Sequence, residues 1–152
     1  MAESIRYVHT CLIARDWEKI AQFYIDVFGC EPVGNERDLK GDWIDKITGI
    51  KNVHIKGVHL KLPGYKYNAP TLEVFQYEPN HYKLGQPLVN GLGFGHIAFQ
   101  VDNVSMMLAK VMAHGGGQVG EYVERKYQGN GTLKVVYARD PEGNIIELQK
   151  WE

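Results

Sequence analysis

Two glutamates in this sequence of 152 residues stand alone in apolar, strand-like surroundings. They are Glu73, in the stretch 71–77, and Glu147, in the stretch 145–149. Because side chains alternate across a strand, each acid leaves the opposite face from its apolar neighbours. A carboxylate on the inner face of a sheet needs a partner, since an unpaired buried charge is costly. Each glutamate is therefore expected to face a cation or a set of hydrogen-bond donors.

Two histidines recur with the same spacing to a glycine that ends a helix. His9 precedes Gly29 by 20 residues (29 − 9), and His96 precedes Gly116 by 20 residues (116 − 96). In each half of the chain, the lone glutamate follows further on. This register indicates an internal repeat in which each copy supplies one histidine near its start and one glutamate near its end.

Two imidazoles and two carboxylates are ligands suited to one divalent metal ion. If the two copies pair through a pseudo-two-fold axis, His9, Glu73, His96 and Glu147 converge. Such a set suits Zn²⁺, Ni²⁺, Fe²⁺, Mn²⁺ or Co²⁺, and the residues do not choose among them. Four protein ligands leave one or two positions open in five- or six-coordination, as in a catalytic site. The sequence therefore predicts one catalytic metal ion.

The elements that must position these residues read β-α-β-β-β in each half. In the first half we expect strands over 6–14, 30–39, 53–62 and 71–77, with a helix over 17–28 between Asp16 as cap and Gly29 as stop. In the second half we expect strands over 94–101, 118–127, 132–138 and 145–149, and a helix over 104–113. Asp140 to Asn144 reads as a tight turn, because Pro141 fixes φ and Gly143 can take a positive φ.

The organisation that follows is α+β, with a first βαβββ module over 1–79, a linker over 80–93 and a second module over 94–152. A short helix at about 41–49 is inserted in the first module and has no counterpart in the second. Its Trp43 either covers the core or forms an apolar wall over a substrate. Phe75 and Tyr77, on the face of Glu73, are further candidates for the substrate pocket. Met106, Met107 and Met112 are expected in the core.

The remaining histidines do not share in the repeat, and we expect no functional role for them: His54, His59, His81 and His114.

A net charge of −1 gives no electrostatic case for nucleic acid or an anionic membrane. No apolar run reaches membrane-spanning length. Cys11 and Cys30 form no disulfide framework, so a reduced, cytoplasmic protein is expected.

At this level of detail the chain resembles the vicinal oxygen chelate superfamily, which comprises glyoxalases, bleomycin-resistance proteins and extradiol dioxygenases. The motifs that carry the resemblance are Tyr7 to Thr10, Phe23 to Gly29, Leu72 to Phe75, Gly95 to Asp102 and Asp140 to Leu148. The resemblance implies paired βαβββ modules that form a curved mixed sheet around a metal cup. By motif match, His9, Glu73, His96 and Glu147 take the family's ligand places. Because the chain has all four of these residues, it is most similar to the glyoxalase I members of the family, which are lactoylglutathione lyases. The resemblance also implies a homodimer.

The main functional hypothesis is a metal-dependent lyase or isomerase acting on a small oxygen-chelating substrate through an enediolate-type intermediate. The metal would act as a Lewis acid, and Glu147 or Glu73 would move the proton on carbon. Segment 41–57 departs from the compact bacterial glyoxalase pattern, so the substrate is left open. The alternatives are an extradiol-type ring-cleaving dioxygenase and a non-enzymatic small-molecule binding protein of the drug-resistance type.

Overall fold

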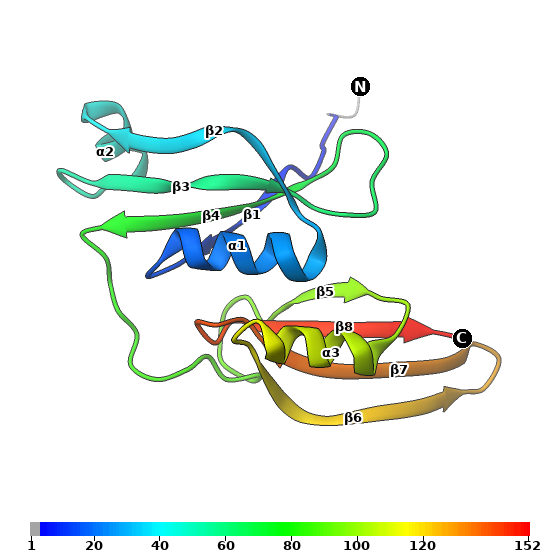
Figure 1. Ribbon diagram of the computed structural model, residues 1–152. Helices are drawn as coiled ribbons and strands as arrows, with labels where there is room; N and C mark the ends of the chain where they lie inside the picture. The colour runs from blue at the N-terminus through cyan, green and yellow to red at the C-terminus, as the bar shows by residue number, and fades with distance from the viewer. Residues whose placement is uncertain (1–3) are drawn as a thin grey trace. The chain divides into compact units, whose positions relative to one another are not determined.

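The computed structural model describes residues 4–152. The chain divides into two compact units, of which the first ends at Tyr82 and the second begins at Lys83. Each unit consists of one four-stranded mixed sheet and one main helix that packs against it (Figure 1).

The first unit contains four strands and two helices. They are β1 (His9–Ile13), α1 (Trp17–Phe28), β2 (Glu31–Lys40), α2 (Asp42–Thr48), β3 (His54–Lys61) and β4 (Thr71–Glu78). The strand order is β1-β4-β3-β2. Strand β4 pairs in parallel with β1 and antiparallel with β3, so β4 lies inside the sheet with a neighbour on each side.

The second unit repeats this plan without the short helix. Its elements are β5 (Ile97–Gln100), α3 (Val104–Ala113), β6 (Gly117–Tyr127), β7 (Gly131–Arg139) and β8 (Ile145–Trp151). The strand order β5-β8-β7-β6 matches that of the first unit position by position. The predicted α+β class with repeated βαβββ order is therefore confirmed.

Helix α1 has a capping residue at each end. The Asp16 side chain accepts a hydrogen bond from the backbone N–H of Lys19 at 3.1 Å, which satisfies a free donor of the first turn. At the other end Gly29 takes the left-handed conformation, with φ 68°, and closes the helix. Ile20 and Tyr24 are fully buried between these ends, so one face of α1 is anchored in the core.

Alternation along β4 separates the two faces of the first sheet. Leu72 and Val74, together with Leu60 of β3, are almost completely buried on the side that contacts α1. Glu73 lies between Leu72 and Val74, and Phe75 follows Val74, so the side chains of Glu73 and Phe75 point to the opposite side. This arrangement places the lone acid on the sheet face that α1 does not cover.

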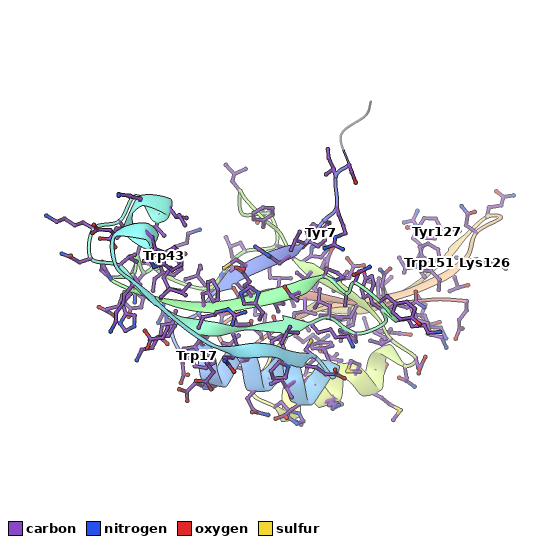
Figure 2. The ribbon with its side chains drawn as sticks, turned by 90° about the horizontal axis from the view of Figure 1, so that it is seen from above. Tyr7, Trp17, Trp43, Lys126, Tyr127 and Trp151 are labelled. Carbon is purple, nitrogen blue, oxygen red and sulfur yellow. The ribbon has the colours of Figure 1, made fainter. Side chains whose placement is uncertain are left out.

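The inserted helix α2 packs through Ile44, which is 5% exposed and joins a cluster with Val53, Ile55 and Phe75. The carboxylate of Asp45 fastens the end of the insertion, because its two oxygens accept hydrogen bonds from the backbone N–H groups that follow, at 2.7 and 3.0 Å. Trp43 of the same helix is 53% exposed and is not a core residue. Figure 2 shows its ring beside α2.

Two expectations from the sequence need correction. Strand β5 begins at Ile97, so His96 lies immediately before the strand and not within it. Helix α3 buries Val104 and Val111, whereas Met106 and Met112 are 71% and 52% exposed. The short apolar face of α3 is thus filled by β-branched side chains, and the methionines lie beside it.

The segment 80–93 contains no helix or strand, and from Lys83 onward it belongs to the second unit, so its role as a linker stays a prediction. Among the helices of residues 4–152, none has the length and apolar character needed to cross a membrane.

Candidate metal centre

Glu73 stands at the centre of a cluster on the first sheet. In the parallel pairing with β1 it lies opposite Cys11, and in the antiparallel pairing with β3 it lies opposite His59. His9 precedes Cys11 by two residues on the same face of β1. We call these four residues, His9, Cys11, His59 and Glu73, the first half-site.

Both imidazoles of the first half-site reach the same carboxylate oxygen. The distance from His9 Nε2 to Glu73 Oε1 is 3.2 Å, and the distance from His59 Nε2 to Glu73 Oε1 is 3.4 Å. The Cys11 thiol donates a hydrogen bond to the same carboxylate. Glu73 is only 8% exposed, so these protein groups replace most of the water that would otherwise solvate its charge.

The electrostatics of the half-site follow from burial and from the charge of Glu73. Burial is the largest cause of a raised pKa for the Cys11 thiol, to about 12, and the charge and hydrogen bond of Glu73 add to it. Burial also lowers the pKa of His59, although the charge of Glu73 opposes that shift. Cys11 is therefore a protonated hydrogen-bond donor at neutral pH, and His59 favours the neutral imidazole.

The second unit carries an equivalent pair with different neighbours. His96 Nε2 lies 2.9 Å from Glu147 Oε2. Glu147 lies opposite Ala98 on β5 and opposite Tyr137 on β7. The Tyr137 ring packs against the His96 imidazole, with ring centroids 5.0 Å apart. We call His96, Ala98, Tyr137 and Glu147 the second half-site.

The chemistry of each His–Glu pair fits a borderline divalent ion. Two ligands at about 2.1 Å from one ion, separated by about 90–100°, have donor atoms about 3.0–3.2 Å apart. The His9–Glu73 and His96–Glu147 distances, 3.2 and 2.9 Å, are close to that range. Among residues 4–152, however, no three His, Cys, Asp or Glu side chains are arranged to hold a metal ion. Each half-site offers a pair of ligands, and the four-ligand centre stays a prediction.

The proposed pocket residues divide into buried and exposed ones. Phe75 is 7% exposed, and its ring meets the His59 imidazole edge to face, with centroids 5.6 Å apart and planes at 70°. Tyr77 packs against the α2 cluster, and burial, followed by the charges of Cys11 and Glu73, raises the pKa of its hydroxyl. Trp43 is exposed on α2. Phe75 therefore lies beside the half-site on the same face of the sheet, and the exposed ring of Trp43 is free to contact a ligand.

Glycine at position 57 allows the Phe75 side chain to approach β3 closely. A Cβ at Gly57 would be 2.1 Å from the Val74 carbonyl oxygen and 2.5 Å from Phe75 Cδ1, both far inside van der Waals contact. Gly57 lies directly opposite Phe75 in the antiparallel ladder. The missing side chain is thus a condition for the close approach of the Phe75 ring.

The turn before β8 is fixed by one buried acid. Asp140 is 2% exposed. Its Oδ1 accepts hydrogen bonds from the backbone N–H groups of Glu142 and Asn144, and its Oδ2 accepts one from Asn144 Nδ2. The expected turn over Asp140 to Asn144 is confirmed, and it leads directly into the strand that carries Glu147.

Of the four histidines outside the repeat, only His59 joins the cluster. His54 pairs with Asp38, and the Nδ1 atom of His114 lies 2.7 Å from the carbonyl oxygen of Lys110. The repeat could not single out His59, because the equivalent residue of the second unit is a tyrosine. The signal that identifies His59 is its register opposite Glu73.

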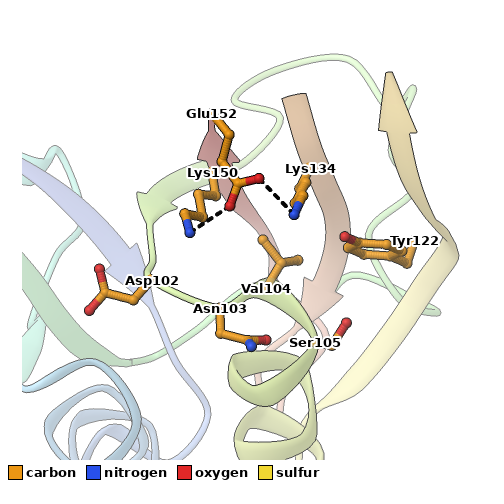
Figure 3. A pocket seen from close by; sticks show the side chains of 8 residues that line it. All are labelled: Asp102, Asn103, Val104, Ser105, Tyr122, Lys134, Lys150 and Glu152. Carbon is orange, nitrogen blue, oxygen red and sulfur yellow. Dashed lines mark ion pairs between the residues drawn. The ribbon is translucent and has the colours of Figure 1, made fainter. Parts of the chain in front are cut away.

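A separate hollow of about 210 Å³ lies at the start of α3, between β6, β7 and β8 (Figure 3). Its two cations, Lys134 and Lys150, each lie 2.8 Å from the Glu152 carboxylate. These contacts, with Lys134 the larger contributor, hold the pKa of Glu152 down to about 2. Because both lysines are already paired with an acid, the hollow is not a candidate site for an anionic ligand.

Comparison with known proteins finds relatives of similar sequence and solved structures of similar fold. It is 25% identical over 144 residues to a probable lactoylglutathione lyase of Vibrio parahaemolyticus, which covers 94% of this chain and 88% of the relative. The structure of a glyoxalase family protein from Bacillus cereus superposes with a TM-score of 0.83 at 20% identity, over 99% of this chain and 96% of the other.

A fosfomycin resistance protein, FosX, from Listeria monocytogenes, solved with Mn(II) and sulfate, superposes with a TM-score of 0.56 at 17% identity, over 100% of this chain and 95% of the other. The family model of the Glyoxalase/Bleomycin resistance protein/Dioxygenase superfamily matches residues 6–148. Since this match spans nearly the whole sequence, the chain belongs to that superfamily.

Proposed function

We propose that the protein is a metal-dependent lyase or isomerase of the glyoxalase type that acts on a small oxygen-chelating substrate. The observation that carries this proposal is the repeated His–Glu pair, 3.2 Å apart in the first unit and 2.9 Å apart in the second. Both pairs occupy the same place in their sheets, since each glutamate lies on the strand between the first and third strands of its unit. The proposed ligands are His9, Glu73, His96 and Glu147.

A divalent ion held by these ligands would supply a Lewis acid for the substrate oxygen on which charge develops. The chain would supply the group that moves the proton on carbon. Glu73 contacts two imidazoles and accepts a hydrogen bond from Cys11, so it is strongly held. In the described residues Glu147 pairs with a single imidazole, that of His96. We therefore assign proton transfer to Glu147 and a fixed ligand role to Glu73.

The substrate would lie over the sheet face that carries the ligands. Trp43, Phe75 and Tyr77 are the proposed pocket residues, with Trp43 offering the exposed ring. The α2 cluster gives this end of the first unit an apolar boundary that the second unit lacks. An apolar portion of the substrate would therefore contact Trp43, while its oxygens approach the ion.

We further propose that the chain works as a homodimer in the cytoplasm. Family resemblance supports the dimer, and the two unpaired cysteines, Cys11 and Cys30, fit a reducing compartment.

The experiment that tests the function begins with metal analysis of protein purified without chelator. The metal-loaded protein is then assayed against hemithioacetals, acyl-CoA epimers and catechols. Isomerisation or lyase turnover that disappears with chelator and returns with Ni²⁺, Zn²⁺ or Co²⁺ supports the proposal. Oxygen uptake with a catechol under Fe²⁺ would instead assign a ring-cleaving dioxygenase, and failure to take up any of these ions would assign a metal-free binding protein.

The assignment of the base is tested with Glu147→Gln. We expect kcat to fall by about 10²–10⁴-fold, the usual contribution of a positioned acid or base. The measurement is made at a metal concentration that saturates the variant, with bound metal quantified in the same sample. Retained metal together with retained activity would remove Glu147 as the base.

A further inference from the structure

We propose that His59 is a positioning residue of the metal centre, and that its imidazole holds the Glu73 carboxylate in the orientation in which Glu73 binds the ion. This role rests on the proposed function, because it requires Glu73 to be a ligand. It concerns a histidine outside the repeated His–Glu pairs, whose position is set by the pairing of β3 with β4.

The contact of His59 with Glu73 is direct. His59 stands opposite Glu73 in the antiparallel ladder, and its Nε2 atom lies 3.4 Å from Glu73 Oε1. The Glu73 side chain is 11% exposed, so water has little access to it. The carboxylate is therefore oriented mainly by protein groups, and in the proposed role His59 offers it an N–H from β3, whereas His9 contacts it from β1 on the other side of β4.

The His59 imidazole is itself held in place. The Phe75 ring meets it edge to face at 5.6 Å. Phe75 is 7% exposed and packs with Ile44 and Ile55 in the α2 cluster. Because Gly57 leaves room for this ring, a continuous set of contacts runs from the inserted helix through Phe75 to His59 and then to Glu73. A donor with a fixed position orients its acceptor better than a mobile one.

We assign His59 a role in positioning the ligand Glu73, and not a ligand role of its own, because the first half-site does not form an ion site by itself. No three metal-binding side chains among residues 4–152 have a suitable arrangement, although His9 and His59 both contact Glu73. In the second half-site the equivalent position is Tyr137, whose ring packs on His96. The two glutamates are therefore supported differently, and His59 makes Glu73 the more firmly held of the two.

Hydrogen-bond partners of metal ligands fix ligand orientation, and their loss usually lowers metal affinity by about 10–100-fold. We expect His59→Ala to raise the Kd for Co²⁺ by this factor. We expect His59→Gln, which keeps an N–H donor on a side chain of similar reach, to restore most of the affinity. The matched control is His54→Ala, because His54 is on the same strand but pairs with Asp38 and not with Glu73.

The experiment is a calorimetric titration of metal-free full-length protein with Co²⁺, accompanied by the visible absorption spectrum of the bound ion. For His59→Ala we expect weaker binding and a shifted Co²⁺ spectrum, while the far-ultraviolet circular dichroism stays that of the folded protein. A role limited to folding would leave the spectrum of the bound ion unchanged. His54→Ala should match the wild type in both affinity and spectrum.

The outcomes separate this role from the proposed function. If the wild type takes up no divalent ion, the proposed function fails and the role of His59 fails with it. If the wild type binds Co²⁺ and His59→Ala binds it with the same Kd and spectrum, only the role of His59 is overturned. Equal losses in His59→Ala and His59→Gln would also overturn it, because the N–H donor would then be irrelevant.

Discussion

Replacement of Gly57 by alanine tests the packing on which the first half-site depends. The added Cβ would lie 2.1 Å from the Val74 carbonyl oxygen and 2.5 Å from Phe75 Cδ1. Non-bonded heavy atoms prefer separations of about 3.5–4.0 Å, so the neighbours must move by more than about 1 Å. The nearest atom belongs to the backbone of β4, which is paired on both sides, and it cannot move without disturbing two ladders.

The expected cost follows from this geometry. Overpacking usually costs about 1–3 kcal/mol, and a clash with a paired backbone belongs at the upper end, about 3 kcal/mol. For a protein of this size each kcal/mol lowers Tm by about 2–4 °C, so we expect Gly57→Ala to melt about 6–12 °C lower. Movement of Phe75 would also release His59, so Co²⁺ affinity should fall in the folded fraction.

The assay is thermal unfolding followed by circular dichroism and by tryptophan fluorescence. The matched control is Gly117→Ala, because Gly117 is also a strand residue but has no atom within 4 Å of an added Cβ. That variant should be neutral or about 0.4–1 kcal/mol more stable, since alanine restricts the unfolded chain. Equal Tm values for the two variants would refute the close approach of Phe75 to β3.

Four further expectations concern the two cysteines, the turn before β8 and helix α2. At pH 8, Cys11 should react with iodoacetamide far more slowly than a free thiol, because a pKa of about 12 leaves about 10³-fold less thiolate. Peptide mass spectrometry measures its rate separately from that of Cys30. Burial raises both thiol pKa values in the folded protein, to about 12 for Cys11 and about 11 for Cys30. Because the unfolded thiols lose their protons at lower pH, the unfolding free energy should fall as pH rises from about 9. In urea titrations, a Cys11→Ser, Cys30→Ser double variant should lose part of that pH dependence. Asp140→Ala should lower the unfolding free energy by about 2–4 kcal/mol, because two backbone donors and one amide lose their acceptor, and an unchanged urea midpoint would contradict that reasoning. Trp43→Ala should leave stability within about 0.5 kcal/mol but raise KM, whereas Ile44→Ala should cost about 2–5 kcal/mol; the reverse pattern would assign Trp43 to the core.

The parts of the fold that depend on nearby residues could be predicted from the sequence. Asp16 and Gly29 mark the two ends of α1, and the predicted bounds, 17–28, are those of the structure. The equivalence of His9 with His96 followed from the repeat, and each histidine does pair with the glutamate of its own unit. Local signals and internal comparison were sufficient for these features.

The neighbours of Glu73 could not be predicted in the same way. His59 faces Glu73 only because β3 and β4 pair in one particular register, and a shift of one residue would place Val58 or Leu60 there. That register depends on the whole buried face of the sheet. The contact of Phe75 with Ile44 joins segments far apart in the chain, and no sequence motif encodes it. Met106 and Met112 of α3 were misplaced because side-chain type alone does not decide which face of a short helix is buried.

Under the proposed function, the position of helix α2 has a consequence for how the range of substrates could change. The excursion that contains α2 leaves and re-enters the sheet at one ladder pair, Lys40 with His54. At the same place in the second unit, Tyr127 pairs with Gly131 and the strands are joined by a tight turn. Length and composition can therefore change at this hairpin tip without shifting the register of β3 against β4. Natural variation in the excursion could alter substrate range while the His–Glu pairs are inherited unchanged.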